Sequence, residues 1–70
     1  MKPNIRLRVL RAERGLSQRD TAIKARLALD RYWRIENGYA EAATEERERL
    51  ARVFKVPVAN VFPDSEAVAS

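Results

Sequence analysis

Residues 18–37, QRDTAIKARLALDRYWRIEN, decide the fold of this 70-residue chain. The pattern predicts a short helix over about residues 17–25, a tight turn at 26–28 and a second short helix over 29–37. Ala22, fifth in the stretch, is small enough to let the two helices cross closely. The apolar positions that lock the pair together are Leu27, Tyr32 and Ile35. This spacing indicates a helix-turn-helix, which lays its second helix in the major groove of DNA.

The flanking residues extend the motif in both directions. Gly15-Leu16-Ser17 precedes it, and Gly38 follows its last residues. From about residue 5 to residue 62 the chain resembles the lambda-repressor/Cro-type (XRE-like) DNA-binding domains. The resemblance implies an all-α fold, a compact bundle of five helices in which the second and third form the helix-turn-helix.

The chain is short enough to predict one domain, residues 1–63, followed by a flexible C-terminal tail at residues 64–70. A first helix over about residues 4–14 ends at Gly15, because glycine readily adopts the left-handed conformation of a helix C-terminus. Ser17 and Asp20 form a capping-box pattern at the start of the second helix. A fourth helix begins near residue 44 and breaks at Val56-Pro57, and a fifth covers residues 58–62.

Composition excludes several classes of function. The chain has no cysteine and no histidine, so thiol chemistry, imidazole bases and the usual zinc ligands are absent, and we expect no metal, no cofactor and no catalytic residues. No apolar run is long enough to span a bilayer, and the N-terminus lacks the apolar core of a signal peptide. We therefore expect a cytoplasmic protein that is neither an enzyme nor a membrane protein. The resemblance places it at a bacterial nucleoid, or encoded by a phage in a bacterial host.

Charge is unevenly distributed along the chain. Residues 1–39 contain ten lysines and arginines and four acids, a net charge of +6, whereas residues 40–70 contain four bases and six acids, a net charge of −2. A basic half suits a polyanion partner, although a solvated basic face is an equal alternative on charge alone. The helix-turn-helix inside the basic half favours double-stranded DNA.

The second helix of the motif is expected to supply the residues that read bases. By position, the resemblance implies base contacts for Leu29, Asp30 and Arg34, with Arg31 and Trp33 beside them. The side chains are chemically suited, because arginine can bond both guanine acceptors, aspartate can accept from cytosine, and leucine can pack on a thymine methyl group. Asp30 has the equal alternative of capping the helix or pairing with Arg34 one turn later.

Other residues are expected at the DNA backbone. The resemblance implies that Gln18 contacts a phosphate and braces the recognition helix, and free helix N-termini favour anions in any case. Arg19 and Asn37 are further backbone candidates. The predicted DNA-binding residues are therefore Gln18, Arg19, Leu29, Asp30, Arg31, Trp33, Arg34 and Asn37.

Several residues depart from the family pattern. Arg26 stands where the family usually has glycine, so a positive φ there would cost about 1 kcal/mol. Ala28 cannot cap the second helix of the motif, which costs about 1 kcal/mol, unless that helix begins late and Asp30 caps it. Trp33 replaces a polar residue and could stack on the DNA backbone, join a dimer contact or lean against Tyr39. Relatives often carry basic residues in the loop 39–43, where this chain has an acid, Glu41.

The resemblance also implies an ion pair between Arg11 and Glu36, joining the first helix to the end of the recognition helix. The alternative is two independent surface charges. Breaking a partly buried pair costs several kcal/mol, about 3–5, because the remaining charge loses its partner. Arg11→Met is therefore predicted to lower thermal stability more than Arg8→Met does.

The leading prediction is a regulator that binds a palindromic DNA site as a homodimer. Apolar residues available for a dimer contact are Val58, Val61, Phe62 and Val68, with intramolecular packing as the alternative for Val61 and Phe62. A second possibility is a protein-interaction module of the same fold, such as an antitoxin, in which a protein partner is primary and DNA binding secondary.

Overall fold

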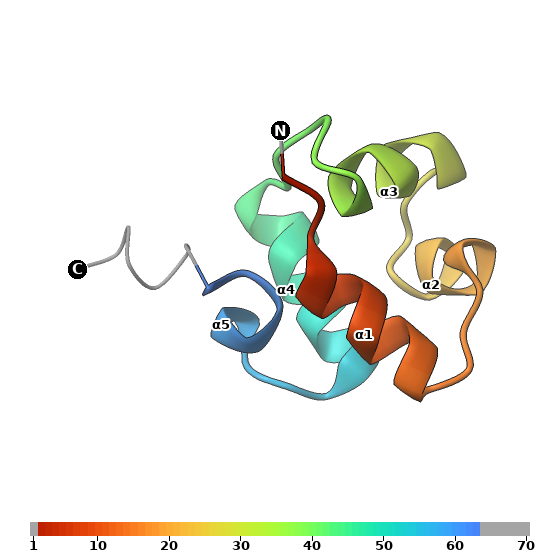
Figure 1. Cartoon of the computed structure of the whole chain (residues 1–70), viewed down its shortest axis with the longest axis vertical. Coiled ribbons are helices and arrows are strands. Elements are labelled where there is room, and N and C mark those ends of the chain that lie inside the picture. Colours follow the sequence, from red (N-terminus) through yellow and green to blue (C-terminus); the bar gives the residue numbers. More distant parts are fainter. Residues whose placement is uncertain (1, 64–70) are drawn as a thin grey trace.

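The computed structural model describes residues 2–63, and these form five α-helices (Figure 1). In chain order the helices are α1 (Ile5–Glu13), α2 (Gln18–Lys24), α3 (Leu29–Glu36), α4 (Thr44–Phe54) and α5 (Val58–Val61). The predicted all-α, five-helix bundle is confirmed. The tail predicted at residues 64–70 lies outside the described residues.

Local capping explains where the first two helices begin. The Asn4 side chain accepts a hydrogen bond from the backbone N–H of Leu7 at 2.9 Å, which caps α1. The Ser17 hydroxyl accepts from the Asp20 N–H at 3.0 Å, and the Asp20 carboxylate accepts from the Ser17 N–H at 3.3 Å. The predicted capping box is therefore present, and it fixes the first turn of α2.

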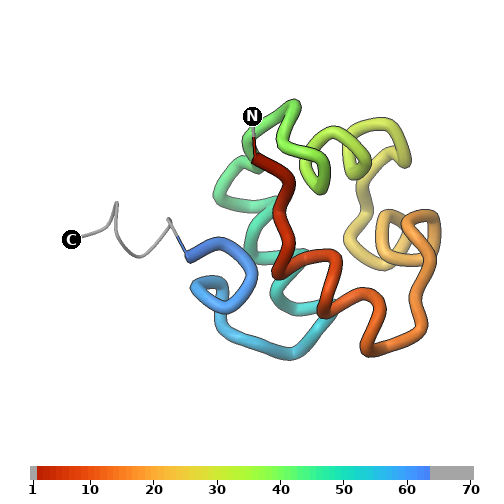
Figure 2. The backbone as a smooth tube through the Cα atoms, in the orientation of Figure 1, coloured from red at the N-terminus to blue at the C-terminus, as the bar shows by residue number. Residues whose placement is uncertain are grey.

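Two glycines end helices, but only one is surrounded by backbone. Gly15 has a φ of +65° and open space around it, whereas Gly38 has a φ of +83°. A Cβ at Gly38 would lie 2.4 Å from the Lys2 carbonyl oxygen. Figure 2 shows the N-terminal segment passing beside the turn that follows α3. The backbone N–H of Asn4 donates to the Glu36 carbonyl at 2.8 Å, so this segment is fastened to the end of α3.

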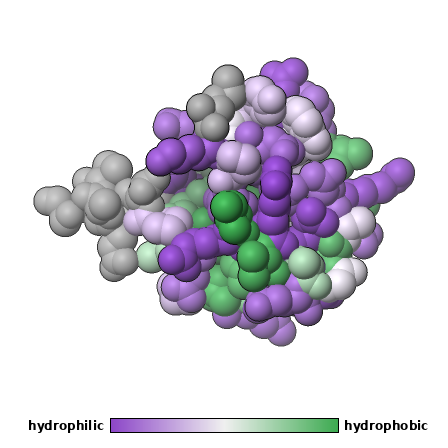
Figure 3. All heavy atoms as spheres, viewed as in Figure 1, coloured by the Kyte–Doolittle hydropathy of each residue, from purple (hydrophilic) through white to green (hydrophobic). Residues whose placement is uncertain are grey.

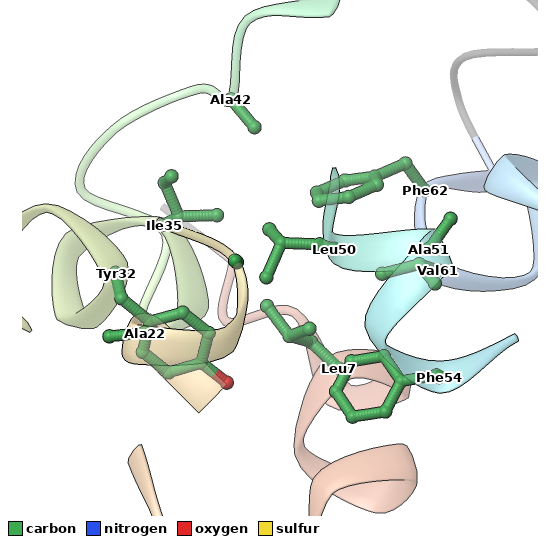
Figure 4. Close-up of a cluster of buried hydrophobic side chains, with 11 residues drawn as sticks. Leu7, Ala22, Tyr32, Ile35, Ala42, Leu50, Ala51, Phe54, Val61 and Phe62 are labelled. Atoms are coloured by element: carbon green, nitrogen blue, oxygen red, sulfur yellow. The ribbon is translucent and has the colours of Figure 1, made fainter. Parts of the chain in front are cut away.

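The core draws apolar side chains from all five helices. Leu7, Tyr32, Leu50, Phe54 and Val61 are each almost fully buried (Figure 4). Further core residues are Ala22, Ala25, Ile35, Ala42, Ala51 and Phe62. Because these side chains pack the helices against one another, the bundle forms a single scaffold for the motif.

Two of the residues considered for a dimer contact are part of this core. Val61 is fully buried and Phe62 nearly so, which confirms intramolecular packing for both and excludes them from a dimer surface. Val58 is partly buried against the core, and Val68 lies outside the described residues. Any dimer contact made by the described part of the chain therefore needs other side chains.

The surface is mostly polar. Figure 3 shows a largely hydrophilic face with a hydrophobic area near its centre, and α1 carries two exposed large apolar side chains, Ile5 and Val9. Within residues 2–63, the helices are too short and too polar to cross a membrane.

Candidate nucleic-acid interface

The second helix of the motif, α3, has one buried and one exposed face. Tyr32, Ile35 and Glu36 face inward. The outward side chains are Leu29, Asp30, Trp33 and Arg34. Ala22 on α2 is 1% exposed, as expected of the residue where two helices cross closely. The predicted inward and outward residues of the motif are thus separated as a DNA-reading helix requires.

A buried carboxylate anchors the inner face of α3. Glu36 is 1% exposed, and its oxygens accept from Arg11 Nε at 2.8 Å, Tyr32 Oη at 2.7 Å and Gln18 Nε2 at 2.6 Å. The ion pair with Arg11 is the one that the resemblance implied. Because the donors come from α1, α2 and α3, one carboxylate joins three helices.

The environment of Glu36 also sets the protonation states of the Glu36 carboxyl group and of the Tyr32 phenol. Burial alone raises the pKa of Glu36, but hydrogen bonds from Arg11, Tyr32 and Gln18 outweigh it, so the pKa lies below its ordinary value. Burial, together with the bond to Glu36, raises the pKa of the Tyr32 phenol. The carboxylate therefore stays ionised and the phenol stays protonated at neutral pH.

Arg8 lies close to the same carboxylate, which sequence reasoning missed. Its Nε is 4.0 Å from Glu36 Oε2, and its guanidinium donates to the Asn37 side-chain oxygen. Arg8 precedes Arg11 by about one helical turn, and this spacing was the available signal. Arg8 is therefore a poor reference for the Arg11 substitution, and the exposed Arg6 is a better one.

Gln18 stands at the first turn of α2, where the predicted phosphate contact would be made. Its amide nitrogen donates to Glu36, which ties the start of α2 to the end of α3. This bond accounts for the bracing that the resemblance implied, while contact with a phosphate stays a prediction. Arg19 beside it is exposed.

Arg34 and Asp30 form an exposed ion pair on the outer face of α3, with Arg34 Nε 3.1 Å from Asp30 Oδ2. Asp30 thus pairs with Arg34, which is one of the two structural roles considered for Asp30 in the sequence. The other alternative, a late start of α3 with Asp30 as its cap, is wrong, because α3 begins at Leu29. Exposed ion pairs contribute little, about 0–1 kcal/mol, so this pair can give way to another partner at low cost.

Trp33 stacks on Tyr39. The ring centroids are 5.3 Å apart and the planes differ by 7°. Of the three contacts considered for Trp33 in the sequence, the structure therefore contains the one with Tyr39. Trp33 nevertheless remains 44% exposed. The Asn37 amide donates to the Trp33 carbonyl at 2.9 Å. The stack and this bond join the end of α3 to the loop that follows it.

Arg31 points toward α4 rather than along the outer face of α3. Its guanidinium donates to Glu46 at 2.7 and 3.0 Å and to the Glu41 carbonyl at 3.0 Å. The hydrogen bond from Arg31 lowers the pKa of Glu46 to about 2. Sequence reasoning did not identify Glu46 as this partner, because fifteen residues separate the two. A DNA contact by Arg31 stays a prediction and would have to be made alongside this pair.

The turn before α3 carries the two departures noted in the sequence. Arg26 has a φ of +59°, the left-handed conformation that favours glycine. Ala28 is the N-cap of α3 and makes no side-chain capping bond. Helix α3 thus begins without the local support that α1 and α2 have, and depends on packing and on Glu36.

Two further observations describe the acidic side chains of the described residues. Among residues 2–63, no cluster of three or more histidine, cysteine, aspartate or glutamate side chains could hold a metal ion. The buried carboxylate is fully occupied by its donors. What the fold presents is an exposed helix on a rigid scaffold.

These features define a class of protein, the helix-turn-helix DNA-binding domains. A family model described as "Helix-turn-helix domain" matches residues 5–61, and the chain belongs to this family. Comparison with curated proteins and with solved structures gave no match. Family membership confirms the resemblance found in the sequence and indicates DNA as the partner.

Proposed function

We propose that the chain is a sequence-specific regulator of transcription that binds double-stranded DNA with α3 in the major groove. One observation carries the proposal: α3 exposes Leu29, Asp30 and Arg34 while Glu36 locks its inner face to α1 and α2. Such a helix can enter a groove without loss of its packing. Base contacts then belong to the exposed residues, and Gln18, Arg19 and Asn37 contact the backbone.

We also propose that the regulator acts as a homodimer on a palindromic operator. A single small module buries too little surface for tight specific binding, and two-fold dimers double the contacts. In this proposal residues 1–63 form the DNA-binding domain and residues 64–70 a tail. The protein acts in the bacterial cytoplasm, on the nucleoid or on a phage genome, without enzymatic activity.

Selection of bound duplexes from a random DNA pool tests this function. We expect an enriched palindrome with half-sites about one helical turn apart. Arg34→Ala is expected to relax selection at one base pair per half-site, by about 1–3 kcal/mol of discrimination. Lys55→Gly, which also removes one exposed positive charge but lies at the end of α4, is the control and should leave the selected sequence unchanged.

Two outcomes would count against the proposal. If no sequence is enriched and binding disappears as salt rises, only electrostatic attraction remains. If Arg34→Ala and Lys55→Gly select the same sequence as the unaltered chain, α3 does not read bases through Arg34.

A further inference from the structure

A basic cleft lies between the end of α2 and the second half of α4. It is open to solvent, has a volume of about 310 Å³ and is lined by Lys24, Arg26, Arg49, Arg52 and Val53. Four cations from three segments of the chain thus line one hollow, and none of the acidic side chains within residues 2–63 lines it. Lys24, Arg26 and Arg52 are exposed, and a cluster of positive side chains with no acid among them attracts anions.

Most of these cations have no partner within the described part of the chain. Between residues 2 and 63, Lys24, Arg26 and Arg52 make no ion pair and no side-chain hydrogen bond. Arg49 is different, because its Nε donates to the Ala25 carbonyl at 2.9 Å. That bond satisfies a carbonyl at the C-terminal end of α2 and fixes the Arg49 guanidinium at the edge of the cleft. The other three cations are available to a ligand.

The cleft is separate from the proposed DNA-reading residues. The candidate residues on α2 lie at its start, Gln18 and Arg19, whereas the cleft uses Lys24 at its other end. No outward residue of α3 lines the cleft. Its ligand therefore differs from the bases that α3 contacts.

We propose that this cleft binds clustered phosphate groups. Guanidinium groups present donors that match phosphate oxygens in pairs, and lysine adds a point charge. The volume of about 310 Å³ is at the lower end of small-ligand sites. A ligand with several phosphate groups would bring several negative charges into this small volume, where four cations line the cleft. The source is either a free oligophosphate or the phosphodiester backbone of a nucleic acid.

Arg26→Gly is the most informative variant. It removes one charge from the cleft and also relieves a left-handed backbone, so loss of binding cannot be attributed to unfolding. Lys55→Gly is its matched control: Lys55 has a φ of +56°, is exposed, and does not line the cleft. Both variants lose one positive charge and the same kind of strain. Arg52→Gln serves as a second cleft variant.

The binding experiment uses two probes, inorganic triphosphate and a DNA duplex that lacks the selected operator, each titrated calorimetrically at low salt. If a free oligophosphate is the ligand, triphosphate binds the unaltered chain. Its dissociation constant then rises about tenfold in Arg26→Gly and Arg52→Gln, as expected for one lost charge-assisted contact, and less than about twofold in Lys55→Gly. If the phosphodiester backbone is the ligand, the same pattern appears with the duplex and not with triphosphate.

The proposal is overturned if the cleft variants and Lys55→Gly behave alike with both probes, including no change in any of them, because binding then follows net charge or does not occur. It is also overturned if a pentaglutamate peptide displaces the bound probe as effectively as phosphate does, because the cleft would then have no preference for phosphate groups.

Discussion

Glu36 shows how a single residue can organise a small domain. A buried charge is costly unless it is paired and fully hydrogen-bonded, and Glu36 receives donors from Arg11, Tyr32 and Gln18. Removing one donor leaves the charge without full compensation, so the effect on stability exceeds that of an ordinary surface contact.

Arg11→Met tests this at the residue scale. We expect it to lower the free energy of unfolding by about 3–5 kcal/mol, because Glu36 is left buried beside fewer donors. Arg6→Met, an exposed residue of the same helix, is expected to change it by less than about 0.5 kcal/mol. Urea unfolding followed by circular dichroism measures both, and equal midpoints would show that the ion pair contributes nothing.

At the scale of helices, much of the structure was predictable because the signals are local. Gly15 and Gly38 marked the ends of α1 and α3, and Ser17 with Asp20 marked the start of α2. The left-handed residue Lys55 that ends α4 was missed, since no glycine announces it.

The contacts that join helices were harder to predict. The resemblance supplied the Arg11–Glu36 pair, but nothing in the sequence indicated that Arg31 would bond Glu46 on α4. The contact of Trp33 with Tyr39 was one of three possibilities, and the sequence did not choose among them. Such partners are chosen by how helices pack, which a linear pattern does not encode. The outward face of α3 followed from helical periodicity, whereas the basic cleft requires a turn and two helices to be placed together.

Ala28→Ser is expected to stabilise α3. Serine at the N-cap can accept a hydrogen bond from the first turn, which adds about 1 kcal/mol to the free energy of unfolding. The same substitution at Ala12, inside α1, should lower it by about 0.5 kcal/mol, since serine is the poorer helix former. Chemical denaturation distinguishes the two. A loss of stability in Ala28→Ser would show that the missing capping bond at Ala28 does not limit the stability of α3.

The contact between α3 and α4 predicts acid sensitivity. The pKa of Glu46 is about 2, below its ordinary value of 4.5, because Arg31 donates to the carboxylate. A lowered folded-state pKa gives stability that is present above about 4.5 and lost as the pH falls toward 2. The lowered pKa of Glu36 acts in the same direction.

Thermal unfolding measured between pH 5 and about 2 checks this window. In Glu46→Gln the chain should be less stable at neutral pH and should lose less stability across the window. Glu48→Gln on the same helix is the control, since Glu48 is exposed and makes no ion pair among residues 2–63. If both variants lose the same stability between pH 5 and about 2, the Arg31–Glu46 pair does not cause the acid sensitivity.

At the scale of the whole molecule, charge and shape act together. The basic half of the chain contains the helix-turn-helix, and the single tryptophan of the chain, Trp33, lies in the second half of α3 and is partly exposed. Trp33 emission is therefore a direct reporter of duplex binding at the proposed surface.

Salt dependence follows from the proposed backbone contacts. Each phosphate contact contributes about 0.9 to the slope of log affinity against log salt, so Arg19→Ala should reduce that slope by about 0.9 for any duplex sequence. Quenching of Trp33 measures the affinity at several salt concentrations. An unchanged slope would place Arg19 away from the DNA backbone.

The single-carboxylate anchor has a consequence for how this protein can be altered. Because α3 is held to α1 and α2 through Glu36 on its inner side, the outer positions 29, 30 and 34 contribute little to the stability of the fold. A library randomised at those positions should yield folded members at high frequency. The domain is therefore a suitable starting point for engineering new operator preferences, with the scaffold inherited unchanged.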